Sequence, residues 1–164
     1  MAIDKKASLQ GLTEDEIEKK AFSKILASAS IAEQSTSKMR AKLEASGYPD
    51  ASINNALEKA CDLGIIDDRR YCECLIRSTL ASGKGLSFVI KEIESIGIDI
   101  DTLDAYQDYL ESGKDSLIEN ALNHLAKHPP RSKNPYASCY RKLVSRGFSH
   151  EIASDAARAY IDSL

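Results

Sequence analysis

The side chains best suited to binding a charged partner lie near the C-terminal end of this chain. Arg131, Lys133, Arg141, Lys142 and Arg146 are close in sequence, and helical spacing brings at least two of the last three to one face. Such a cluster can contact the phosphates of nucleic acid or the carboxylates of an acidic protein. It can equally be a solvated helix face, because the sequence pI is about 5.7 and the chain as a whole is not basic.

Basic residues recur earlier in the chain, and we predict that ten bases in all contact a macromolecular partner. They are Arg40, Lys42, Arg69, Arg70, Arg77, Lys84, Lys91, Arg141, Lys142 and Arg146. Their spacing allows a basic stripe along one side of the molecule.

Catalysis needs a convergent set of side chains, and the sequence offers no such set. Gly83-Lys84-Gly85 lacks the GxxxxGK[ST] frame that surrounds a phosphate with backbone amides, so we interpret it as a helix terminator and loop. His124 and His128 have a spacing that can hold a metal, but without a third ligand we interpret them as a solvated helix C-terminus. We therefore expect no enzyme activity, no catalytic residues, no cofactor and no metal.

The four cysteines, Cys61, Cys72, Cys74 and Cys139, include no CxxC pair. This pattern indicates neither a zinc site nor a disulfide framework, and we interpret all four as small buried apolar residues. Cys72 and Cys74 lie two apart on a predicted helix and should point to different faces.

The composition favours helices. With 43% hydrophobic and 29% charged residues and only four prolines, the chain can bury a core without cross-links. No apolar run approaches the ~20 residues that cross a bilayer, and the first ten residues lack a secretory signal, so we expect a cytoplasmic protein with no membrane contact. Charge is uneven: residues 67–112 carry ten acids and five bases, net −5, whereas residues 113–164 carry eight bases and five acids, net +3.

Three glycine-apolar pairs reveal an internal repeat. Gly47, Gly97 and Gly147 are fifty residues apart, and each is followed by an apolar residue. Glycine after the last helical turn can adopt the left-handed conformation that closes a helix. Apolar residues precede each glycine by eight and by four positions, on one helical face: Met39 and Leu43, Val89 and Ile93, Cys139 and Leu143.

Each glycine-capped helix is the middle one of three. A first helix precedes it, opening after Thr13, at Asp67 or Asp68, and at Asp115; a third follows it, opening at Asp50, at Asp99 or Asp101, and at Ser149. We predict an all-α fold of three tandem three-helix repeats that form an elongated, curved array. The expected division is a flexible N-terminal segment at 1–13 and repeats at 14–66, 67–112 and 113–164.

Five segments in the central stretch stand in a distinctive order: Asp67-Asp68-Arg69-Arg70-Tyr71, Ile76-Arg77, Gly83-Lys84-Gly85, Ile90-Lys91-Glu92-Ile93 and Gly97-Ile98. This order resembles the RecX family of regulators of the RecA recombinase. The family signature has paired acids, an aromatic residue, a base, a glycine turn and an E-[LI]-x-x-x-G-[IV] segment. Ser35 to Tyr48 and Leu63 to Asp68 are also similar, although Glu33-Gln34 stands where members often carry bases.

The resemblance implies a protein that docks along the groove of the RecA-DNA filament, bridges recombinase subunits, and modulates filament growth in recombinational DNA repair and the SOS response. We expect the modulation to be inhibition, with stimulation left open by the sequence, and we expect a monomer. Single- or double-stranded DNA would be at most a weak direct partner. The alternative that the residues leave open is a helical-repeat nucleic-acid-binding protein that contacts phosphates through its basic third repeat.

Overall fold

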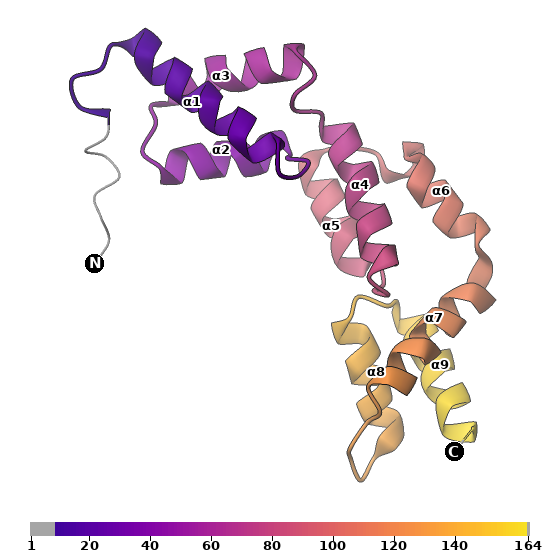
Figure 1. Ribbon diagram of the computed structural model, residues 1–164. Coiled ribbons are helices and arrows are strands. Elements are labelled where there is room, and N and C mark those ends of the chain that lie inside the picture. The colour runs from indigo at the N-terminus through magenta and orange to yellow at the C-terminus, as the bar shows by residue number, and fades with distance from the viewer. Residues whose placement is uncertain (1–8, 164) are drawn as a thin grey trace. The chain divides into compact units, whose positions relative to one another are not determined.

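The protein is all-helical, as predicted. The computed structural model describes residues 9–163, and these contain nine α-helices and no strand (Figure 1). The helices are α1 (Glu14–Ala29), α2 (Thr36–Ala45), α3 (Asp50–Asp62), α4 (Asp68–Ala81), α5 (Ser87–Ile96), α6 (Asp104–Glu111), α7 (Gly113–Lys127), α8 (Pro135–Ser145) and α9 (His150–Asp162), with a 3-10 helix η2 (Ile100–Thr102) before α6. No helix in the described part of the chain is long and apolar enough to span a bilayer.

The chain forms two compact units, of which the first ends at Tyr71 and the second begins at Cys72. This boundary falls inside α4, four residues after the start of the helix at Asp68. The division into three repeats and the residue bounds of those repeats stay predictions. The expected flexible segment 1–13 lies mostly outside the described residues.

Each unit has its own apolar core. In the first unit α1, α2 and α3 bury a cluster around Ile25 and Ile53, and in the second α7, α8 and α9 bury one around Leu125 and Ile152. The apolar pairs that precede the three glycines are all buried, which confirms the predicted helical face: Met39, Leu43, Val89, Ile93, Cys139 and Leu143.

Several helices begin where the sequence predicts. Thr13 opens α1 with a capping box, in which its hydroxyl accepts from the Glu16 N–H (3.3 Å) and the Glu16 carboxylate accepts from the Thr13 N–H (2.8 Å). The Asp67 carboxylate accepts from the Arg70 N–H at 2.9 Å, and Ser149 caps α9. These short-range bonds depend only on neighbouring residues, which is why the sequence reveals them.

Two predicted starts differ from the structure by a few residues. Asp99 caps the 3-10 helix η2, where its carboxylate accepts from the Asp101 N–H at 3.1 Å, whereas α6 itself begins at Asp104. There the carboxylate of Glu73, on α4, accepts from the Asp104 N–H at 2.7 Å and the Ala105 N–H at 2.9 Å. This cap comes from a residue distant in sequence and so leaves no local signal. Helix α7 begins at Gly113, two residues before the predicted Asp115, and Ser112 alone separates it from α6.

The predicted glycine caps are confirmed. Gly97 closes α5 with φ of 85°, and Gly47 and Gly147 follow α2 and α8 with φ of 81° and 86°. A β-branched residue would be strained at such a φ, because its side chain would collide with its own backbone.

The interpretation of the cysteines is only half right. Cys72 and Cys139 are buried, whereas Cys61 and Cys74 are exposed. The exposure of Cys74 follows from the helix, since a residue two positions from the buried Cys72 faces away from the core.

Candidate functional site

The candidate site is built on the polar face of α7 in the second unit. The opposite face of this helix carries the buried Ala121 and Leu125. A helix that packs one stripe of apolar residues must turn its remaining residues outward. The outward stripe has the spacing i, i+3, i+4 and i+7 and consists of Asn120, Asn123, His124 and Lys127.

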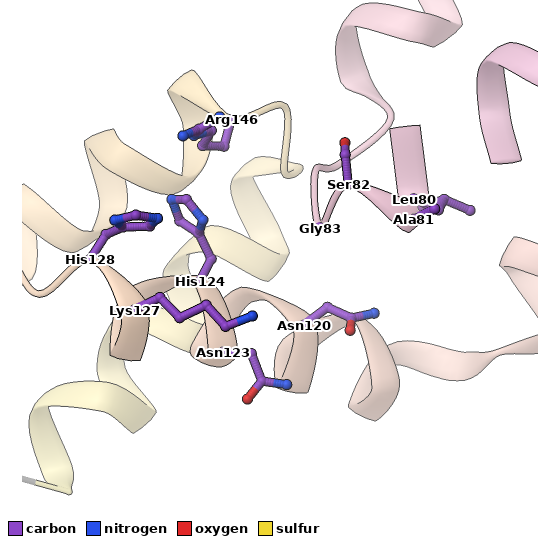
Figure 2. Close-up of a pocket in the computed structure, with 10 residues that line it drawn as sticks. All are labelled: Leu80, Ala81, Ser82, Gly83, Asn120, Asn123, His124, Lys127, His128 and Arg146. Carbon is purple, nitrogen blue, oxygen red and sulfur yellow. The ribbon is translucent and has the colours of Figure 1, made fainter. Parts of the chain in front are cut away.

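This stripe borders a hollow of about 500 Å³. His128 and Arg146 complete the α7 and α8 side, and the end of α4 with the Ser82–Gly83 turn forms the other side (Figure 2). The whole lining consists of Leu80, Ala81, Ser82, Gly83, Asn120, Asn123, His124, Lys127, His128 and Arg146.

Backbone contacts between two turns hold the hollow together. The Gly85 N–H donates to the Arg146 carbonyl at 3.1 Å, and the Ser87 N–H donates to the Gly147 carbonyl at 2.9 Å. A Cβ atom on Gly85 would lie 2.2 Å from the Gly147 carbonyl oxygen, so only glycine allows this approach. The turn after α4 is thereby fixed against the end of α8, which carries Arg146.

The hollow concentrates positive charge. None of its ten lining residues is acidic, whereas Lys127 and Arg146 carry positive charge. The imidazole rings of His124 and His128 have centroids 5.0 Å apart, with Arg146 beside them (Figure 2). Burial lowers the pKa of His124, and the positive charges of Arg146, His128, Lys142 and Lys127 lower it further.

A second hollow, of about 410 Å³, shares Lys127 and His128 with the first. Its remaining lining residues are Pro129, Arg131 and Lys142. Together the two hollows form a continuous basic surface on the second unit, which we call the α7–α8 basic surface. A surface of this charge attracts anions.

The structure gives the three predicted bases of α8 different roles. Arg146 lines the first hollow, and Lys142 borders the second while its Nζ donates to the His128 carbonyl at 2.6 Å. Arg141 is exposed, and its Nε donates to the carbonyl of Ala137 on its own helix at 3.2 Å. Of these three bases, Arg146 and Lys142 belong to the α7–α8 basic surface and Arg141 does not.

The predicted bases between the start of the second unit and the end of α5 are Arg77, Lys84 and Lys91, and all three are exposed. Arg77 lies 3.3 Å from the Glu73 carboxylate, with 59% of its side chain accessible. Lys84 belongs to the turn after α4, and Lys91 lies on α5 between the buried Val89 and Ile93. Their side chains can reach a partner without disrupting a core.

Two of the predicted bases in the first unit serve the fold. Arg70 donates to the Glu33 carboxylate at 2.7 Å and to the carbonyls of Gly64 and Ile65, so it holds the turn before α4. Lys42 donates from Nζ to the Ser28 hydroxyl at 2.7 Å, near the end of α1.

The contact of Lys42 matches that of Lys142, because both lysines precede the capping glycine by five positions and both reach the end of the preceding helix. The other two predicted bases of this unit differ in exposure. Arg40 is half-buried and donates to the Asn54 side-chain oxygen at 2.7 Å, whereas Arg69 is exposed at the start of α4.

Sequence reasoning missed Asn120, Asn123 and Lys127 as parts of a site. The signal that could have found them is the polar stripe of α7, which the apolar stripe on the opposite face defines. The position of this stripe beside the end of α4 depends on tertiary packing, and no local sequence pattern predicts it. Among residues 9–163, no three His, Cys, Asp or Glu side chains are arranged to hold a metal ion.

Solved structures share this fold. A crystal structure of RecX from Lactobacillus salivarius aligns with a TM-score of 0.64 at 19% identity, covering 92% of this chain and 99% of that one. A second crystal structure of regulatory protein RecX aligns with a TM-score of 0.64 at 20% identity, covering 91% of this chain and 73% of that one. This likeness supports the predicted fold class.

Curated proteins give the stronger sequence match, although no protein-family model matches the chain. Regulatory protein RecX of Pseudomonas entomophila is 32% identical over 114 residues, covering 68% of this chain and 72% of the relative. That of Chromohalobacter salexigens is 30% identical over 120 residues (71% and 77%), and that of Prosthecochloris aestuarii is 29% identical over 152 residues (89% and 94%). The order of motifs in the central segment, the helical fold and these relatives agree: the chain belongs to the RecX family of regulatory proteins.

Proposed function

We propose that this chain is a cytoplasmic, monomeric regulator of the RecA recombinase that binds the RecA-DNA filament and inhibits its growth during recombinational DNA repair and the SOS response. The observation that carries the proposal is membership of the RecX family, whose relatives at 30% and 32% identity are named regulatory proteins. A regulator of an assembly needs a binding surface, and we propose the exposed bases of the second unit for this role.

The physical mechanism is differential affinity. A ligand shifts an assembly equilibrium only to the extent that it binds one state more tightly than another. If this chain binds a filament state that cannot extend, each bound molecule prevents one filament end, or one neighbouring subunit, from taking part in further growth.

The test adds the purified full chain to preformed RecA filaments on single-stranded DNA. ATP hydrolysis and filament length are followed over time. We expect both to fall in a concentration-dependent manner. No change in either quantity at several-fold excess over RecA would refute the proposal.

A triple variant identifies the surface. Arg77→Ala, Lys84→Ala and Lys91→Ala together remove three exposed charges and no buried group, so the helical circular dichroism should persist. We expect weaker filament binding.

The matched control is Lys19→Ala, Lys20→Ala and Arg158→Ala, which removes the same charge from other exposed helical positions. Equal loss in both triple variants would show that net charge, and not the predicted surface, determines binding. Undiminished filament binding by the first variant would show that Arg77, Lys84 and Lys91 are not part of the contact.

A further inference from the structure

The α7–α8 basic surface contains cations without acidic partners. Elsewhere in the second unit Arg77 is 3.3 Å from Glu73, and Lys114 is 2.5 Å from Glu151 and 2.7 Å from Asp155. In the described part of the chain, neither Lys127 nor Arg146 forms such an ion pair. Positive charge gathered in a concave site without carboxylates raises the local concentration of anions.

The side chains in the first hollow match the chemistry of a phosphate group. Arg146 offers a forked guanidinium, Lys127 an ammonium, and the two imidazoles and the amides of Asn120 and Asn123 offer further N–H donors. A volume of about 500 Å³ lies within the range of sites that hold small molecules of nucleotide size.

A metal cation is a poorer match for the same residues. His124 and His128 have the i, i+4 spacing that can hold a transition metal, but metal sites need three or four ligands. Lys127 and Arg146 would repel a divalent cation at this position. The same two charges attract a phosphate.

We propose that this hollow binds the phosphate group of a nucleotide, free or within a nucleic-acid strand, and that His124 takes up a proton when the phosphate binds. The proposal goes beyond regulation of the recombinase and does not depend on it, so either can fail alone.

The proton uptake follows from the charges around His124. Arg146 and Lys142 act on it from α8, and His128 and Lys127 act on it from α7; all four favour its neutral form, as burial does. The end of α4 contributes no ionisable side chain to the lining. A bound phosphate reverses the local field and favours the imidazolium, so its affinity should rise as pH falls from 7.5 to 6.5, by at most about tenfold for one coupled proton.

Titration calorimetry on the full chain at low salt tests the proposal with ATP, with adenosine and with a short oligothymidylate. We expect ATP or the oligothymidylate to bind and adenosine not to bind. Binding of ATP alone identifies a free nucleotide as the ligand, and binding of the oligothymidylate alone identifies the strand; either supports the phosphate site. Equal binding of adenosine and ATP, or no binding of either phosphate ligand at millimolar concentration, would overturn it.

Two variants localise the site. Lys127→Ala with Arg146→Ala should weaken phosphate binding at least tenfold, whereas Lys133→Ala with Arg141→Ala removes two exposed charges nearby and should change it less than twofold. His124→Gln should leave binding of the oligothymidylate measurable but reduce its pH dependence, because phosphodiesters do not titrate in this range. Equal losses in both double variants, with helicity retained, would show a diffuse charge effect and refute the site.

A RecA filament assay with the Lys127→Ala and Arg146→Ala variant separates the two proposals. Retained inhibition beside lost phosphate binding shows that the phosphate site is distinct from the recombinase contact.

Discussion

Replacing Gly85 by alanine should destabilise the second unit through a steric conflict between two turns. The new Cβ atom would lie 2.2 Å from the Gly147 carbonyl oxygen and 2.4 Å from the Phe148 nitrogen. Ordinary contacts between heavy atoms are about 3.5 Å, so the turns must separate by roughly 1 Å. That movement stretches the Gly85–Arg146 and Ser87–Gly147 hydrogen bonds beyond useful length.

The expected cost combines two effects. Overpacking costs about 1–3 kcal/mol, and each of the two lost hydrogen bonds adds about 0.5–1.5 kcal/mol, which gives about 2–6 kcal/mol in all. The matched control is Gly83→Ala in the same turn, where φ is 69° and a Cβ meets no atom within 4 Å. Only backbone strain of about 1–2 kcal/mol should follow there.

Urea unfolding followed by circular dichroism measures both costs. With an m-value of about 1.5 kcal/mol/M, Gly85→Ala should lower the urea midpoint of the second unit by about 1–4 M. Hydrogen exchange should accelerate at residues 85 and 87, whose N–H groups donate the two lost hydrogen bonds, in this variant but not in Gly83→Ala. A Gly85→Ala protein no less stable than Gly83→Ala, with unchanged exchange at those residues, would refute the steric reasoning.

Three further perturbations test individual contacts. Glu73→Ala removes the cap of α6 and should cost about 1–2 kcal/mol in urea unfolding, with faster hydrogen exchange at Asp104 and Ala105; unchanged exchange would contradict the cap. Thr13→Ala breaks the capping box of α1 and should cost about 1 kcal/mol, measured as the free energy of unfolding of the first unit. His124 has a lowered pKa in the folded protein, so the unfolded chain binds more protons and stability should fall as pH drops below about 6.5; His124→Gln should flatten that dependence in thermal melts, and an unchanged dependence would exclude His124 as its source.

The sequence predicts those features of the fold that depend on neighbouring residues. The capping box of Thr13 and the left-handed Gly97 each involve a few adjacent positions, and the buried pair Met39 and Leu43 follows from helical periodicity. The cap that Glu73 supplies to α6 was not predictable in this way, because it joins segments about thirty residues apart and no local pattern records the pairing.

The candidate site shows the same limit more strongly. The sequence shows where the lysines and arginines are but does not predict which contacts they make. Arg70 and Lys142 donate hydrogen bonds to backbone carbonyls of their own units, whereas Arg146 lines a hollow. The outward stripe of α7 could have been predicted from its apolar stripe. Its partner, the end of α4, could not, because the glycine contact that joins them gives no sign in composition or spacing.

The contact between Gly85 and Gly147 also limits when the second unit can fold during translation. Gly85 is synthesised long before Gly147, with the residues of α5, α6, α7 and α8 in between. Until Gly147 leaves the exit tunnel, the turn after α4 lacks its hydrogen-bond partners, although the first unit is already complete. The second unit should therefore gain protection from proteases only after Gly147 has emerged, because residues synthesised late complete a contact with a turn synthesised much earlier.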